Sequence, residues 1–172
     1  MRRTLILAGI TSLVLNLVRF GSGGVSLRED SSRAALASLG REYGDLQLWA
    51  TAIAATTDTL PSADSERARV LAEQLARLIQ PLEEDFENTT AALSTSQLEE
   101  VLPLWERMAF AHAGFVMLEE QAVALGRDPA LDPSELHELV TQLSAVLDFA
   151  TEIQRLILSR LTTPDASPLR IT

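Results

Sequence analysis

The stretch VLPLWERMAFAHAGFVMLEEQAVAL, residues 101–125, decides the fold. Its apolar residues recur at alternating steps of three and four, a spacing that places them on one face of an α-helix. Ser96-Gln97-Leu98-Glu99 has the spacing of a capping box, and Gly126 is a typical left-handed helix terminator. We therefore expect one long helix between Ser96 and Gly126. Its apolar stripe consists of Val101, Leu104, Met108, Ala111, Phe115, Leu118, Ala122 and Leu125.

Three more stretches repeat this period. They predict a helix from Ser26 to Thr57, a second that follows Pro61, and a last that is capped by Asp132 and ends near Thr163. The second helix keeps its phase beyond Pro81, so we expect a kink there and not a full stop. In the first helix, Gly40 and Gly44 lie one turn apart and predict a close approach by a neighbouring helix.

Four helices of similar length with short connections pack with each neighbour antiparallel. The expected fold is therefore all-α, an up-down-up-down antiparallel four-helix bundle over residues 27–163, with an irregular tail over 164–172. Apolar residues make up 47% of the chain and aromatic residues only 5%, which predicts a core of Leu and Ala.

Composition also excludes several chemistries. The chain has no cysteine, which excludes disulfides, zinc–thiolate sites, iron–sulfur clusters and thiol catalysis. The formal charge of −10 argues against nucleic acid as a partner, because phosphate binding needs a cationic surface. All 14 basic residues are Arg, which we interpret as codon bias in a GC-rich bacterial genome.

The amino terminus differs from the rest of the chain. Arg2 and Arg3 precede an uncharged apolar run over residues 4–18, and Arg19 follows it. This pattern predicts a transmembrane anchor over residues 1–20 and a flexible linker over 21–26. The run covers roughly 22 Å as a helix, and the flanking arginines can snorkel to extend its reach. The residues predicted to lie in the lipid bilayer are Leu5, Ile6, Leu7, Ile10, Leu13, Val14, Leu15, Leu17, Val18 and Phe20.

Two alternatives stay open for this segment. Gly21-Ser22-Gly23 has the small residues of a signal-peptide cleavage site, and the apolar run could also be a first helix buried in a soluble core. An anchor and a signal peptide both place the bundle outside the cytoplasm, because Arg2 and Arg3 hold the amino terminus inside. We expect a periplasmic bundle at the inner membrane, or a periplasmic or secreted protein after cleavage. The exported part is acidic, near −13.

The two histidines are the candidate ligands for a cofactor. A di-iron bundle needs Glu-x-x-His pairs, and Ala109 and Ser134 stand where those glutamates would be. His137 is interpreted as an exposed residue in the first turn of its helix. His112 lies at the edge of the apolar stripe and is either hydrogen-bonded at a helix seam or an axial ligand for haem or a chlorophyll-type pigment. We expect no metal site and no catalytic residue, since no nucleophile elbow or phosphate loop is present.

Three aromatic residues are candidate partner contacts. Trp49 and Trp105 flank the apolar stripes, where each either closes the edge of the core or anchors a partner protein. Phe110 lies off its stripe altogether and indicates a second apolar surface.

Two functions from different classes follow. The first is a non-catalytic accessory subunit with a single span, whose bundle scaffolds a larger assembly of membrane protein subunits; respiratory and photosynthetic complexes contain small subunits of this kind. The second is a secreted or periplasmic bundle that binds haem, a metal or a hydrophobic ligand between its helices.

Overall fold

The computed structural model describes residues 25–61 and 63–162, with side chains described from Ser31 onward. Within these residues every regular element is helical, as predicted. The helices are α2 (Val25–Thr57), α3 (Ser65–Ile79), α4 (Pro81–Ala92), α5 (Thr95–Arg127) and α6 (Pro133–Thr162). The predicted anchor over 1–20, residues 21–24 of the linker and the tail over 164–172 lie outside the described residues. No helix within 25–61 and 63–162 combines the length and apolarity needed to cross a membrane.

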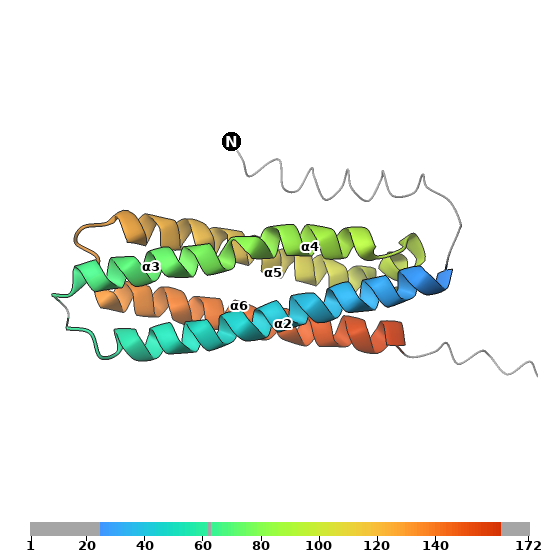
Figure 1. Ribbon diagram of the computed structural model, residues 1–172, viewed down its shortest axis with the longest axis horizontal. Helices are drawn as coiled ribbons and strands as arrows, with labels where there is room; N and C mark the ends of the chain where they lie inside the picture. Colours follow the sequence, from blue (N-terminus) through green and yellow to red (C-terminus); the bar gives the residue numbers. More distant parts are fainter. Residues whose placement is uncertain (1–24, 62, 163–172) are drawn as a thin grey trace, which may run out of the picture.

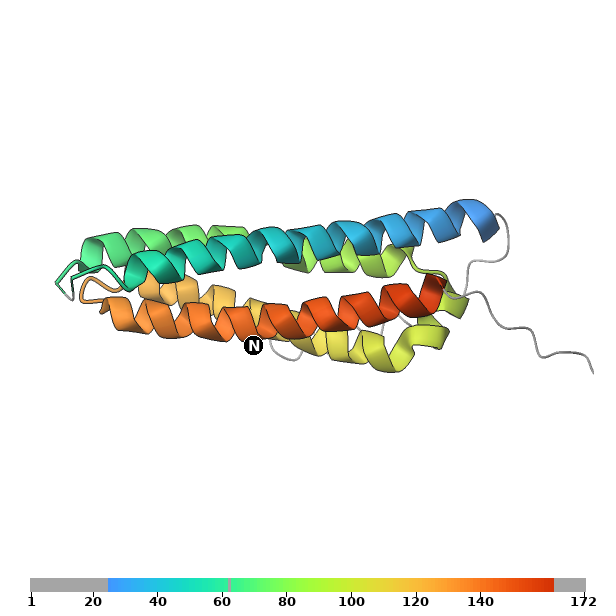
Figure 2. The same cartoon turned by 90° about the horizontal axis from the view of Figure 1, so that it is seen from below.

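The helices form four antiparallel rods, because α3 and α4 follow one another in one rod (Figure 1). Around the bundle, α2 packs on α6, α6 on α5, α5 on α3, and the α3–α4 rod closes the ring against α2. Figure 2 shows α2 and α6 side by side over most of their length. The described helices are therefore arranged as the predicted up-down-up-down bundle.

A change of direction at Pro81 divides the second rod. Gln80 keeps helical backbone angles, φ −48° and ψ −43°, between the end of α3 and the start of α4. Proline has no amide hydrogen, so the turn at Pro81 lacks one intrahelical hydrogen bond and the rod bends there. As a result, α3 packs mainly on α5, whereas α4 packs mainly on α2. The predicted kink thus redirects the rod from one neighbour to another.

The ends of α5 correct two expectations. The capping box is Ser94 with Gln97, whose side chain accepts from the Ser94 amide at 2.9 Å, and not Ser96 with Glu99. Both pairs have the same spacing, so the sequence alone does not separate them. Gly126 lies inside the helix and Asp128 is the C-cap. A Cβ on Gly126 would lie 2.7 Å from Glu73 Cγ, so this glycine allows close packing against α3 and does not terminate the helix.

The helices α2, α3 and α6 begin close to where the sequence predicted. The Asp64 side chain accepts from the Arg67 amide at 3.3 Å, and Asp132 Oδ1 accepts from the Ser134 amide at 2.8 Å. The first helix begins at Val25, one residue before the expected start at Ser26. Hydrogen bonds of this kind satisfy backbone donors that a helix leaves unpaired at its amino end.

The core consists mainly of Leu and Ala, with Tyr43, Phe86, Trp105 and Phe115 as its rings. One close crossing joins α2 to α6, where Gln154 Nε2 donates to the Leu36 carbonyl at 2.9 Å. A Cβ on Gly40 would lie 2.5 Å from the same Nε2 atom, so Gly40 has the packing role that was predicted. Gly44 does not: a Cβ there would meet nothing within 4 Å, because this position faces outward.

Candidate functional site

The described surface carries two sets of exposed large apolar residues on different helices. On α2, Leu48 is 71% exposed and Trp49 is 55% exposed. On α5, Phe110 is 75% exposed and Met117 is 54% exposed. Because α2 and α5 are not neighbours in the ring of helices, these residues form separate surfaces. Trp49 and Phe110 are therefore accessible to a partner, as the sequence suggested.

For Trp105 the structure favours the other alternative, a place in the core, over a partner contact. Its side chain is buried, and its ring stacks on Phe86 of α4 with centroids 5.2 Å apart and planes inclined by 14°. The bend at Pro81 brings α4 over this part of the core, and Phe86 covers the indole. Trp105 is thus a core residue and does not present a contact to a partner.

His112 lies deep in the bundle instead of at its edge. Its Nε2 atom is 2.5 Å from the Tyr43 hydroxyl, and Phe86 stacks on its ring at a centroid distance of 4.1 Å. The same hydroxyl lies 3.3 Å from Met108 Sδ. The hydrogen bond expected of His112 is therefore present, but it lies in the core, between two helices that face each other across the bundle, and not at a seam between neighbouring helices.

Burial controls the protonation of this pair. It lowers the pKa of His112 to about 3 and raises the pKa of Tyr43 above its ordinary value, since both charged forms lose hydration. The imidazole and the phenol are therefore both neutral near pH 7. The buried Nδ1 atom of His112 has no hydrogen-bond partner.

A haem or pigment ligand needs open space at a ring nitrogen. Tyr43 occupies the direction of Nε2, and Phe86 covers one face of the ring. Binding of a haem or a chlorophyll-type pigment by His112 stays a prediction, and it would require these two rings to move. Within the described residues, no group of three or more His, Asp or Glu side chains is arranged to hold a metal ion.

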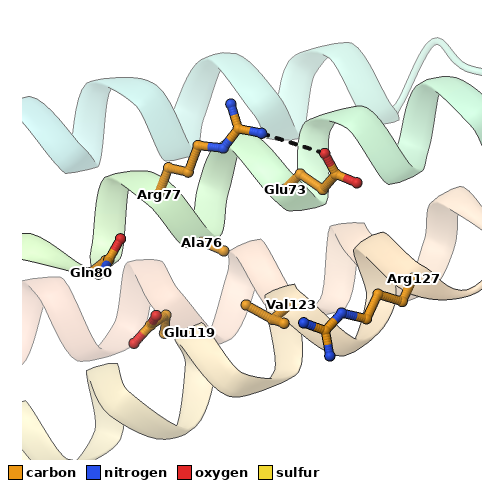
Figure 3. Close-up of a pocket in the computed structure, with 7 residues that line it drawn as sticks. All are labelled: Glu73, Ala76, Arg77, Gln80, Glu119, Val123 and Arg127. Atoms are coloured by element: carbon orange, nitrogen blue, oxygen red, sulfur yellow. Dashed lines mark ion pairs between the residues drawn. The ribbon is translucent and has the colours of Figure 1, made fainter.

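A groove of about 280 Å³ lies between α3 and α5, beside the bend at Pro81. Its lining residues are Glu73, Ala76, Arg77, Gln80, Glu119, Val123 and Arg127. Figure 3 shows Glu119 and Arg127 on either side of Val123, with the Arg77–Glu73 ion pair on the opposite helix. Burial and the neighbouring Glu83 and Glu120 raise the pKa of Glu119 above its ordinary value. This lining holds no nucleophile beside a base, so its arrangement indicates no covalent chemistry.

A pair of acidic side chains joins α2 to α4. Burial, first, and then the neighbouring Asp85 carboxylate together raise the pKa of Glu42 to about 7. Both effects disfavour the charged form of Glu42, because it loses hydration and is repelled by the Asp85 charge. The sequence placed Glu42 off the apolar stripe and gave no signal for this pair, since its partner is distant along the chain.

No family model, no curated protein and no solved structure matches this chain.

Proposed function

We propose that the chain is a non-catalytic accessory subunit of a membrane protein assembly. Its apolar residues 4–18 hold it in the lipid bilayer, and its bundle, on the periplasmic side of the inner membrane, is a rigid docking element. The observation that carries the proposal is the exposure of Phe110, at 75%, and Met117, at 54%, on an otherwise acidic bundle. Large apolar side chains that lie together on a surface mark sites of protein contact.

The packing of the described residues supports a scaffold. Leu36, Tyr43, Met108 and Phe115 in the middle of the bundle are at most 1% exposed. Side chains that interdigitate in this way resist deformation, which suits an element that holds other subunits at fixed positions. The unpaired Nδ1 atom of His112 is enclosed by this packing.

The anchor is tested by alkaline extraction of membranes from cells that express the full chain. We expect wild-type protein to remain in the pellet after washes with carbonate and with high salt. Leu13→Arg places a charge in the middle of the apolar run and should move the protein to the supernatant, whereas Leu13→Val should leave it in the pellet. Release of the wild type by carbonate would overturn the anchored-subunit proposal.

Assembly is tested separately, by native electrophoresis of membranes solubilised in digitonin. The wild type should migrate in a band far heavier than its own 18.7 kDa. Mass spectrometry of that band should then return membrane protein subunits in constant ratio to this chain. Migration as a free chain would overturn the scaffold role even if the anchor is correct.

A further inference from the structure

The outward side of α5 carries a row of exposed apolar residues, which Glu106 interrupts between Leu102 and Phe110. Leu102, Phe110, Ala113 and Met117 are all exposed, and they recur at intervals that keep them on one side of the helix. Helices α3 and α6 pack on the other sides of α5, so no described element covers this ridge. We call these four residues the α5 ridge.

The middle of the ridge has the shape of a helix-packing site. Phe110, Ala113, Gly114 and Met117 stand at positions i, i+3, i+4 and i+7, the four positions that form one hole in knobs-into-holes packing. Two of the four are the smallest residues available, and they lie between two large apolar side chains. Gly114 is half-buried, and a Cβ on it would lie 3.4 Å from Val146 Cγ1 of α6. The site therefore suits one large apolar side chain from an additional helix, outside the bundle, that lies along α5.

The charges around the ridge are of one sign. Glu99, Glu106 and Glu120 are exposed along the same side of α5, and none of them forms an ion pair within the described part of the chain. Arg107 is the cation beside them, and its guanidinium lies over the Phe149 ring of α6, 5.3 Å from the centroid. Burial, Glu83 and the adjacent Glu120 raise the pKa of Glu119 above its ordinary value, which adds a further acidic group to this part of α5.

We propose that the α5 ridge binds an amphipathic helix of a partner subunit, with an apolar stripe for the Phe110–Met117 hole and Lys or Arg on its flanks. This inference rests on the proposed function, because it names the chemistry of the partner that the scaffold would hold. Unpaired glutamates beside an apolar contact favour a cationic partner and speed its association.

The same charges disfavour a second copy of this chain as the occupant. Two α5 ridges facing each other would bring Glu106 and Glu120 of one copy close to the glutamates of the other. Like charges that face each other across an interface repel, and this repulsion would destabilise a homodimer without compensation. The chain's own residues 1–19, which include Arg2, Arg3 and Arg19, are the other cationic apolar candidate, and the experiment includes them as an outcome.

The experiment uses the purified full chain in nanodiscs of phosphatidylcholine, a lipid without net charge. The probe is a fluorescein-labelled helical peptide with Leu in heptad positions and Lys on both flanks, and its twin carries Glu in place of every Lys. Fluorescence anisotropy should give binding of the Lys peptide that weakens with added salt, and at least tenfold weaker binding of the Glu peptide. Empty nanodiscs measure any binding of either peptide to lipid.

Variants locate the binding. Phe110→Ser with Met117→Ser should weaken binding of the Lys peptide about tenfold, because truncating central apolar contacts removes most of an interface's affinity. The matched control, Leu48→Ser with Trp49→Ser, removes two exposed apolar residues from α2 and should bind as the wild type does. Glu106→Gln with Glu120→Gln should reduce the dependence of binding on salt. Circular dichroism establishes that each variant retains its helices.

Three results would overturn the proposal. One is equal affinity of the Phe110–Met117 double variant and the wild type, and another is equal affinity for the Lys and Glu peptides. The third comes from a photo-reactive benzoylphenylalanine at position 110: a cross-link to a second copy, or to residues 1–19 of the same chain, would identify a different occupant. None of these results depends on carbonate extraction, so the inference can fail while the anchored-subunit proposal stands, and the reverse.

Discussion

The Tyr43 hydroxyl and His112 Nε2 lie 2.5 Å apart in the core, and this contact joins α2 to α5. Both groups are neutral, since burial lowers the pKa of His112 to about 3. Tyr43→Phe would leave the imidazole with neither nitrogen paired, because Nδ1 already lacks a partner. We expect a loss of about 1–3 kcal/mol in the free energy of unfolding, measured by urea denaturation.

The double variant Tyr43→Phe with His112→Phe is the control for that measurement. Replacing both polar groups with apolar ones of similar shape removes the unpaired nitrogen, so its cost should be smaller than the sum of the two single variants. Simple additivity of the two single variants would show that the hydroxyl–imidazole contact contributes nothing to stability.

The crossing of α2 and α6 gives a matched pair of glycine variants. Gly40→Ala places a methyl group against the Gln154 amide, which itself bonds to the Leu36 carbonyl, and should destabilise the protein by about 1–3 kcal/mol. Gly44→Ala meets nothing within 4 Å and should stabilise it by up to about 1 kcal/mol through helix propensity. Thermal unfolding of both variants measures the difference, and a shift of the same sign in both would contradict the packing described here.

The Glu42–Asp85 pair predicts how stability depends on pH. The pKa of Glu42 is raised from 4.5 to about 7 in the folded chain, so between these values the folded state holds more protons than the unfolded state. The stabilisation from this group is therefore complete below about pH 4.5 and is lost as the pH rises through about 7. Urea denaturation across this range should show the decline, together with any contribution from other titrating groups.

Glu42→Gln should flatten this decline, because an amide keeps a donor toward Asp85 at every pH. Glu87→Gln is the control. Glu87 is exposed and lies in α4, as Asp85 does, so this variant should leave the pH profile as it is in the wild type. An unchanged profile in Glu42→Gln would contradict the raised pKa of Glu42.

The sequence predicted the helices and their order because each apolar stripe repeats over many turns, as from Val101 to Leu125. It could not assign the residues beside a stripe. Trp49 and Trp105 each lie one position away from a stripe residue, yet Trp105 is covered by Phe86 and Trp49 is 55% exposed. The difference comes from the position of α4: the sequence predicted the kink at Pro81, but not which helices α4 would pack against beyond it.

For the candidate site, too, the sequence predicted some features and could not predict others. Phe110 was predicted to mark a second surface, because its distance from the stripe depends only on the period of its own helix. The burial of His112 was not predicted, because it depends on Tyr43 and Phe86, which lie on other helices. The unpaired state of the glutamates on α5 also required knowledge of which arginines lie close to them in space.

The most direct test of the scaffold role is native electrophoresis of digitonin-solubilised membranes that contain the wild type, Phe110→Ser with Met117→Ser, or Val70→Ser. Val70 is exposed on α3, away from the α5 ridge, and controls for the loss of a surface apolar residue. We expect a large assembly for the wild type and for Val70→Ser, and a shift of the Phe110–Met117 variant toward the free chain. Wild-type protein that migrates as one 18.7 kDa chain in its detergent micelle would contradict the scaffold role.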